Sequence, residues 1–104
     1  MNRHSEIKAI PLTQGFATVV DLEDFLKFGK YKWYAKFSTG KTPYAARSVR
    51  KNGHTKTIRL HREIMNAPFD MEVDHKNGDT LDNRRSCNLR VVTKQKNLEN
   101  RSYG

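Results

Sequence analysis

Four side chains in the segment 73–97 are of the types that could act together on a phosphate group. Asp74 and His75 are adjacent, and Asn88 and Asn97 follow them. Carboxylate and carboxamide oxygens suit a hard cation such as Mg²⁺ or Mn²⁺. An imidazole, with an ordinary pKa of about 6.5, can take a proton from water near neutral pH. These residue types predict a site in which a base and one bound cation act on a phosphodiester.

Each of these residues can be given a role in hydrolysis. Only the neutral imidazole of His75 can accept a proton, so its other ring nitrogen must donate a hydrogen. We expect the side-chain carbonyl of Asn88 to accept that hydrogen and fix the tautomer. A cation held by Asp74 and Asn97 would stabilise the charge on the leaving 3′ oxygen. We therefore predict His75 and Asn88 as catalytic residues, and Asp74 and Asn97 as ligands of one divalent ion per site.

Two strands, a loop and a helix must position these side chains. A short apolar segment, 71–73, leads to Asp74 and predicts a strand, and Asn77-Gly78 predicts a turn after it. The segment 89–92 predicts a second strand. Thr93 is a suitable N-cap for a helix over 94–100. In the loop we expect Asp79 and Asp82 to serve as turn and loop residues, and Asn83 to cap or lock the loop.

The order Asp74-His75, Asn88-Leu89-Arg90 and Asn97 resembles the HNH nuclease family, in particular the short phage and intron-associated homing endonucleases. In that family the acid–histidine pair ends the first strand of a ββα-metal motif. The middle asparagine orients the histidine, and the last His or Asn binds the metal. The resemblance implies a His-Asn-Asn version of the motif, and cleavage that leaves 5′-phosphate and 3′-hydroxyl ends.

The composition points to a polyanionic partner. The 104 residues include 20 Lys and Arg against 11 Asp and Glu, which gives a net charge of +9 and a pI of about 9.9. With no apolar run near 18 residues and no visible signal peptide, nucleic acid is favoured over a membrane. We expect a cytoplasmic protein of a phage-infected or element-carrying bacterial host. Cys87, the single cysteine, excludes an internal disulfide and a structural zinc site with several cysteines.

The N-terminal region is predicted to begin with two short strands over 6–20, followed by a helix over 22–28 with Asp21 as its N-cap. The buried face of this helix is expected to hold Leu22, Phe25 and Leu26. His61, in a short helix over 61–66, is expected to bridge the sheet and the ββα element; the alternative is a phosphate or metal contact.

The strands 44–50 and 55–60, joined around Asn52-Gly53, are predicted to pair with the Trp33 segment in a three-stranded antiparallel sheet. Trp33 is expected to pack in the core. This region resembles the plant-type AP2 sheet module that accompanies HNH motifs in some phage endonucleases. The predicted DNA contacts, some of them on outward positions of this sheet, are Arg47, Arg50, Lys51, Lys56, Arg59, Arg84, Arg85 and Arg90.

These observations predict an α+β fold with a DNA-binding sheet region, 1–68, and a ββα-metal motif, 69–104, within one compact unit. The predicted function is a metal-dependent endonuclease that nicks or cleaves double-stranded DNA as a monomer or homodimer. One alternative is a non-catalytic DNA-binding module with a degenerate ββα unit. Another is an RNA-binding protein, which would need Trp33, Tyr34 and Tyr44 as exposed stacking platforms.

Overall fold

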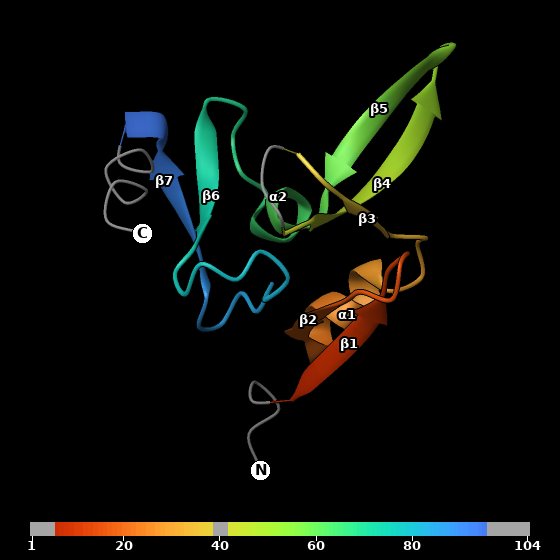
Figure 1. Cartoon of the computed structure of the whole chain (residues 1–104). Helices are drawn as coiled ribbons and strands as arrows, with labels where there is room; N and C mark the ends of the chain where they lie inside the picture. The colour runs from red at the N-terminus through yellow and green to blue at the C-terminus, as the bar shows by residue number, and fades with distance from the viewer. Residues whose placement is uncertain (1–5, 39–41, 96–104) are drawn as a thin grey trace.

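The computed structural model describes residues 6–38 and 42–95 of the chain (Figure 1). The elements are β1 (Ile7–Pro11), β2 (Ala17–Asp21), α1 (Leu22–Phe28), β3 (Tyr34–Lys36), β4 (Tyr44–Lys51), β5 (His54–Arg59), α2 (Leu60–Met65), β6 (Met71–His75) and β7 (Leu89–Thr93). The strands form three antiparallel sheets with the orders β1-β2, β3-β4-β5 and β6-β7. The fold is mixed α+β, as predicted, and the three-stranded antiparallel sheet is confirmed.

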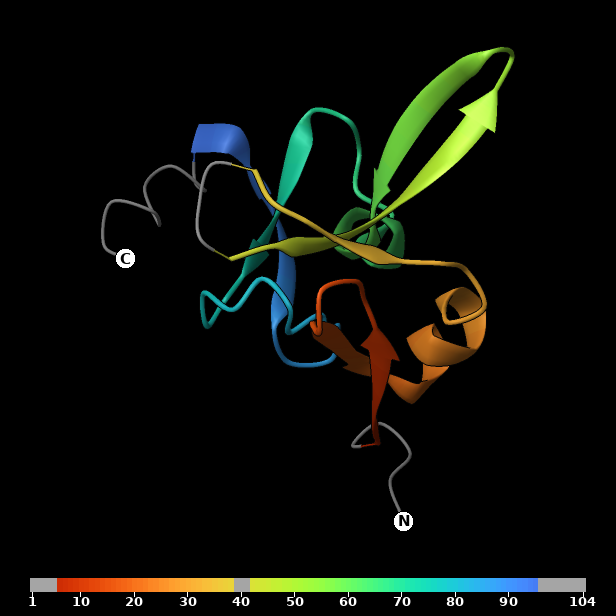
Figure 2. The ribbon, with the colours of Figure 1, turned by 45° about the vertical axis from the view of Figure 1, so that its right-hand side comes forward.

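The long hairpin β4–β5 is set by its turn. Asn52 and Gly53 have φ values of 52° and 77°, and a two-residue turn with both φ values positive matches the twist of the flanking strands. Lys51 therefore pairs with His54, and the register continues down to Ala46 opposite Arg59. Figure 2 shows this hairpin projecting from the rest of the molecule.

The helix α2 is central to the packing. It contacts β4, β5, β6 and β7, and it lies between the hairpin and the β6–β7 sheet in Figures 1 and 2. Its buried side chains, Leu60 and Ile64, are four residues apart and so lie on one face. They join a core of Ile10, Val20, Trp33, Ala45, Val73 and Leu89, to which all three sheets contribute. The predicted core position of Trp33 is confirmed, and its indole N–H donates to the Phe28 carbonyl at 2.7 Å.

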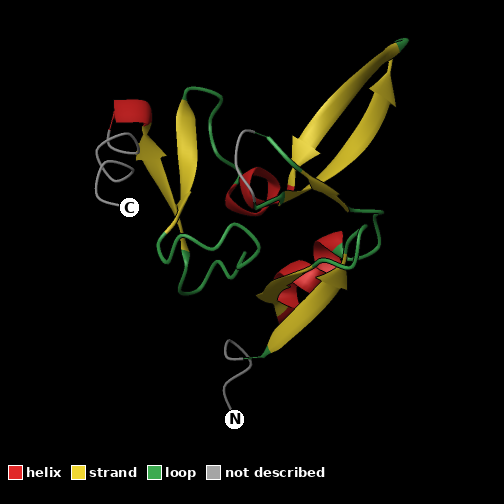
Figure 3. Ribbon diagram, viewed as in Figure 1, coloured by secondary structure: helices red, strands yellow, loops and turns green. Residues whose placement is uncertain are grey.

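The N-terminal hairpin supports the loop between β6 and β7, which is drawn in green in Figure 3. The N–H of Val19 donates to the Leu81 carbonyl at 2.9 Å, and the N–H of Asn83 donates to the Val19 carbonyl at 2.8 Å. Val19 and Asp82 thus form a short parallel bridge. The loop that follows His75 is therefore held against β2 at this bridge.

Helix α1 has the predicted bounds, and Phe25 packs against the core as predicted, but Leu26 does not. Leu26 is 70 % exposed, whereas Asp24 is only 1 % exposed. The inward face meets the β6–β7 loop, where Arg85 Nη2 lies 3.2 Å from Asp24 Oδ1. Burial raises the pKa of Asp24, and the positive charge of Arg85 opposes that shift. The inward face of α1 thus includes an ion pair to the loop that the apolar pattern did not predict.

Asp21 lies at the N-cap position of α1 but makes no side-chain cap bond, contrary to the prediction. Its carboxylate instead accepts from the N–H and the hydroxyl of Ser86, both at 2.9 Å. A carboxylate oriented away from its own helix cannot reach the first-turn N–H groups. Asp21 therefore anchors the far end of the β6–β7 loop.

The predicted strands around the motif are confirmed as β6 and β7. A helical turn begins at Lys94 and Gln95. The rest of the predicted helix, including Asn97, lies outside the described residues. Within residues 6–38 and 42–95, no helix is long and apolar enough to cross a membrane.

Candidate active site

His75 ends β6 and faces the interior. Alternate side chains of a strand share a face, so His75 lies on the same side as the buried Val73. Its Nε2 is 2.8 Å from Oδ1 of Asn83, a side chain with 0 % exposure. The predicted partner was Asn88, and this part of the prediction is wrong. The loop passes over the end of β6 at Asn83, and this places the amide of Asn83, and not that of Asn88, within hydrogen-bonding distance of the imidazole.

Asn88 holds the two ends of the loop together. Its Oδ1 accepts from the N–H of Asn77 at 3.1 Å, and its Nδ2 donates to the Asp82 carbonyl at 2.7 Å. Both hydrogen-bonding groups of this buried amide are therefore committed to the backbone. Asn88 can act on His75 only by fixing the loop that carries Asn83.

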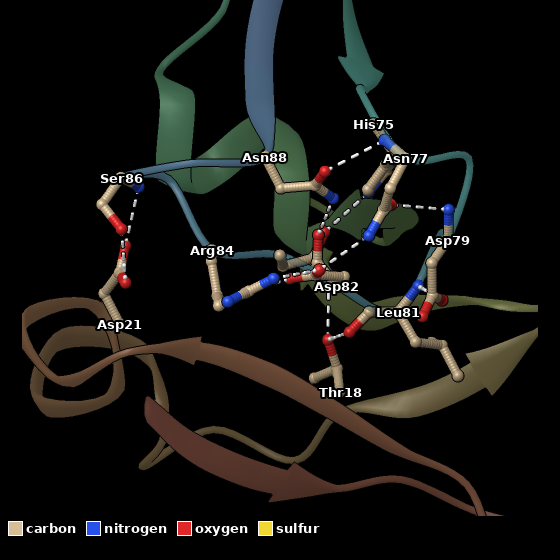
Figure 4. Close-up of polar contacts among 11 residues, drawn as sticks. Thr18, Asp21, His75, Asn77, Asp79, Leu81, Asp82, Arg84, Ser86 and Asn88 are labelled. Carbon is tan, nitrogen blue, oxygen red and sulfur yellow. Dashed lines mark hydrogen bonds and ion pairs between the residues drawn. The ribbon is translucent and has the colours of Figure 1, made fainter. Parts of the chain in front are cut away.

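The remaining loop residues lock its shape (Figure 4). Arg84 donates to both carboxylate oxygens of Asp82 at 2.7 Å, and Asn77 Nδ2 donates to the same carboxylate at 2.9 Å. The bonds from Arg84 hold the pKa of the Asp82 carboxyl below its usual range. Asp79 accepts from the N–H of Leu81 at 3.0 Å. Asp79 and Asp82 are thus turn and loop residues, as predicted.

Asp74 is paired with its cross-strand neighbour. Arg90 lies directly opposite it in the β6–β7 register, and Nε and Nη2 of Arg90 lie 2.8 and 2.7 Å from Asp74 Oδ2. These contacts end on one oxygen, so Oδ1 of Asp74 can still serve as a hard ligand beside His75. Among the described residues, no group of three or more His, Cys, Asp or Glu side chains could hold a metal ion. The donor set therefore fits an oxygen-bound cation only if amide, water or phosphate oxygens complete it.

His61 bridges the sheet and the site, as predicted. Its ring centroid is 6.1 Å from that of Tyr44 on β4 and 5.1 Å from that of His75. The buried Nδ1 of His61 has no hydrogen-bond partner among the described residues. Burial, aided by the neighbouring His75 and by the positive charges of Arg59 and Arg62, lowers the pKa of His61 to about 3. Burial also lowers the pKa of His75, while the bond to Asn83 and the nearby carboxylates oppose that shift.

The predicted DNA contacts fall into three groups. Arg84, Arg85 and Arg90 form ion pairs with loop, α1 and β6 carboxylates. The side chain of Arg47 is 18 % exposed and lies 4.0 Å from the Tyr31 ring centroid, so its predicted outward position is wrong. The exposed basic residues of the hairpin are Arg50, Lys51, Lys56 and Arg59.

A cleft of about 500 Å³ lies beside the base of the hairpin. It is bounded by β5, α2 and the start of β6, and Lys56, Arg59 and Phe69 are among its lining residues. Neither Asp74 nor His75 lines it. The candidate active site is instead the end of β6 with the loop over it.

The stacking platforms that an RNA-binding function would require are not exposed. Trp33 is 5 % exposed, and Tyr34 and Tyr44 are half-buried. This arrangement does not favour the RNA-binding alternative.

Residues 66–99 match the model of the HNH endonuclease family. No curated protein and no solved structure matches the chain at a significant level. The matched residues include the β6–β7 sheet and its loop, while β1 to β5 lie outside them. The match supports the HNH family for this segment and suggests a nuclease that acts on DNA. Nucleases of this family generally use divalent metal ions.

Two residues that the sequence analysis did not assign to the site are Thr18 and Asn83. Asn83 contacts His75 directly, and its Nδ2 donates to Thr18 Oγ1 at 2.8 Å. The available signal was the strand pattern of β2, where Thr18 stands two residues before the buried Val20 and so shares its inward face. A hydroxyl at a core position is costly unless it is hydrogen-bonded, which marks Thr18 as a residue with a partner.

Proposed function

We propose that the chain is a metal-dependent HNH endonuclease of the phage or mobile-element homing type, which hydrolyses phosphodiester bonds of double-stranded DNA. The observation that carries this proposal is the position of His75. His75 lies at the end of a strand, next to the carboxylate of Asp74. One of its ring nitrogens is bonded to the buried Asn83, and the other is available to accept a proton. Burial lowers the pKa of His75, which keeps the imidazole neutral and able to accept a proton near pH 7.

In this proposal His75 takes the proton from water through the nitrogen that Asn83 does not bind. Asp74 Oδ1 and the side chain of Asn97 would hold one Mg²⁺ or Mn²⁺ ion. Such an ion, when bound, stabilises negative charge on the phosphate and the leaving oxygen. Asn88 contributes by holding the loop, and not by a contact with the imidazole.

The exposed cations of the hairpin are the proposed DNA-binding surface. Arg50, Lys51, Lys56 and Arg59 extend along the projecting β4–β5 strands, in the part of the chain compared above with the AP2 module (Figure 2). A two-stranded ribbon of this kind fits the major groove of DNA. With one site per chain, each binding event cuts one strand, so a double-strand break requires a homodimer or a second event.

The decisive experiment is incubation of supercoiled plasmid with the protein and Mg²⁺ or Mn²⁺. We expect open-circular product that disappears when EDTA is added. His75→Ala should lower the single-turnover rate by roughly 10² to 10⁴, the usual contribution of a general base, with little change in DNA affinity. His54→Ala, at an exposed histidine on β5, is the matched control and should cut at the wild-type rate on saturating DNA. A His75→Ala protein as fast as wild type would show that His75 is not the base.

A non-catalytic DNA-binding module is the second candidate, and one observation favours it. Asp74 Oδ2 is engaged by Arg90, which reduces what the carboxylate can offer a cation. This candidate predicts salt-sensitive DNA binding with no plasmid conversion under any divalent metal ion. The same plasmid assay therefore distinguishes the two.

A further inference from the structure

We infer that Thr18, on β2, fixes the tautomer of His75 through the side-chain amide of Asn83; the inference rests on the proposed role of His75 as the base. Consecutive hydrogen bonds of 2.7, 2.8 and 2.8 Å connect the Leu81 carbonyl, Thr18, Asn83 and His75. Thr18 and Asn83 both have 0 % exposure, so water cannot substitute for either partner.

The first bond of this chain sets the direction of the others. A carbonyl oxygen only accepts, so Thr18 must use its single hydroxyl hydrogen for Leu81. The Thr18 oxygen can then only accept from Asn83, which places the amide NH₂ of Asn83 toward Thr18. The amide oxygen of Asn83 consequently faces His75, and Nε2 of the imidazole must carry the hydrogen. Nδ1 is left with a free lone pair.

The reversed amide is possible but makes fewer bonds. It would place the NH₂ of Asn83 against Nε2 and so require the opposite tautomer of His75. The hydroxyl of Thr18 would have to leave Leu81 and donate to the Asn83 oxygen instead, so two bonds would remain where three are observed. The Leu81 carbonyl accepts from the N–H of Val19 in either case. The observed direction is therefore favoured by one buried hydrogen bond.

The direction matters because only one tautomer leaves a usable base. Nε2 of His75 is closed off by Asn83, so a lone pair on that nitrogen could not reach a water molecule. A hydrogen on Nε2 leaves the lone pair on Nδ1, the nitrogen that Asn83 does not cover. Thr18 touches neither substrate nor reacting atoms in this account, and it acts as a positioning residue.

Two variants separate this role from simple packing. Thr18→Val keeps the shape of the side chain and removes the hydroxyl, whereas Thr18→Ser keeps the hydroxyl and removes the methyl group. Without the hydroxyl, the end of the Asn83 amide that faces position 18 has no hydrogen-bond partner there, whichever way the amide is oriented. The preference for one orientation is then lost, and we expect both tautomers of His75 to be populated.

The readout is long-range ¹H–¹⁵N correlation NMR of histidine-labelled protein, without DNA or metal, at about pH 8, where an ordinary histidine is neutral. The signals of His75 are assigned by their loss in His75→Ala. Wild type and Thr18→Ser should show predominantly the pattern of the Nε2–H tautomer. Thr18→Val should show the two tautomers in comparable amounts. Its cleavage rate on saturating plasmid should fall by up to about twofold, because the fraction of His75 with a free Nδ1 lone pair falls from most of the population to about half.

Three outcomes would overturn the inference. Wild-type His75 could carry its hydrogen on Nδ1, which is measurable whether or not any variant folds. Thr18→Val could keep the wild-type proportion of the Nε2–H tautomer, or Thr18→Ser could lose that proportion as fully as Thr18→Val does. If no protein cuts plasmid while the NMR patterns appear as expected, the proposed nuclease function fails and the tautomer control stands.

Discussion

His61 shows what burial does to a single ionisable side chain in this fold. Its folded-state pKa of about 3 lies well below the ordinary value of 6.5. Between these values the unfolded chain binds a proton that the folded chain does not. The stability due to this group is therefore fully present above pH 6.5 and is lost as the pH falls toward 3.

This predicts that His61 contributes to acid sensitivity. Each pH unit within that window costs about 1.4 kcal/mol of unfolding free energy. His61→Phe keeps a ring between Tyr44 and His75 but cannot titrate. Between pH 7 and pH 5 the variant should lose roughly 2 kcal/mol less stability than wild type, as measured by urea denaturation.

The matched control is His54→Phe, at an exposed histidine, which should follow the wild-type pH dependence. Equal losses in wild type and His61→Phe would show that His61 takes up its proton without unfolding the chain.

The contacts of a single side chain also explain why Arg47 is a poor probe of DNA binding. Its guanidinium lies 4.0 Å from the Tyr31 ring centroid and 5.5 Å from that of Trp33, and Nη2 is 3.6 Å from Glu63 on α2. A change there would disturb the packing of the sheet on its neighbours. Loss of DNA affinity in such a variant could not be assigned to a lost phosphate contact.

At the scale of elements, the β4–β5 hairpin provides the cleaner test. Lys51 and Lys56 are exposed, and they lie on the two strands of the hairpin near its turn. Each phosphate contact releases counterions and contributes about −0.9 to the slope of log K against log[salt]. The double change Lys51→Gln with Lys56→Gln should make the slope shallower by up to about 1.8, while the rate on saturating DNA is kept. Binding isotherms at several salt concentrations measure this slope.

Lys8→Gln provides the control for charge alone. Lys8 is exposed on β1, away from the hairpin, and should change the slope little. If Lys8→Gln changed the slope as much per charge as the double variant, the net charge of the chain, and not the hairpin, would account for binding.

At the scale of the whole molecule, the predicted regions 1–68 and 69–104 are closely joined. Thr18 and Asp21 on β2 bond to Asn83 and Ser86 of the β6–β7 loop, and the core cluster includes side chains from every sheet. The loop over His75 therefore depends on an N-terminal hairpin that the HNH family match does not include.

We expect a single cooperative unfolding transition as a result. Fluorescence of Trp33, the single tryptophan, reports on the first region, and amide exchange of residues 76–88 reports on the second. Both should give the same midpoint and the same unfolding free energy in urea. Distinct midpoints would mean that the two regions fold independently, and that the contacts of β2 with the loop contribute little.

The sequence by itself predicted the features of the fold that depend only on residues close together in the chain. The strands of the β4–β5 hairpin and of β6–β7 followed from alternation and from turns such as Asn52-Gly53, which depend on neighbouring residues alone. The order of Asp74, His75 and Asn88 predicted the HNH family, which the match over residues 66–99 supports. The assignments of Asp74 and Asn97 as metal ligands remain predictions.

Only the tertiary structure decided which groups meet. Asn83 rather than Asn88 bonds to His75, and Asn83 is in turn held by Thr18, 65 residues away in the sequence. Three of the predicted loop and strand arginines, Arg84, Arg85 and Arg90, are engaged in ion pairs within the chain. In the sequence alone, Asn83 and Asn88 offer the same donors and acceptors, and so do the arginines, so none of them shows which partner it will have. The partner of each is fixed only when the packing of distant elements brings one donor and one acceptor within reach and excludes water from the rest.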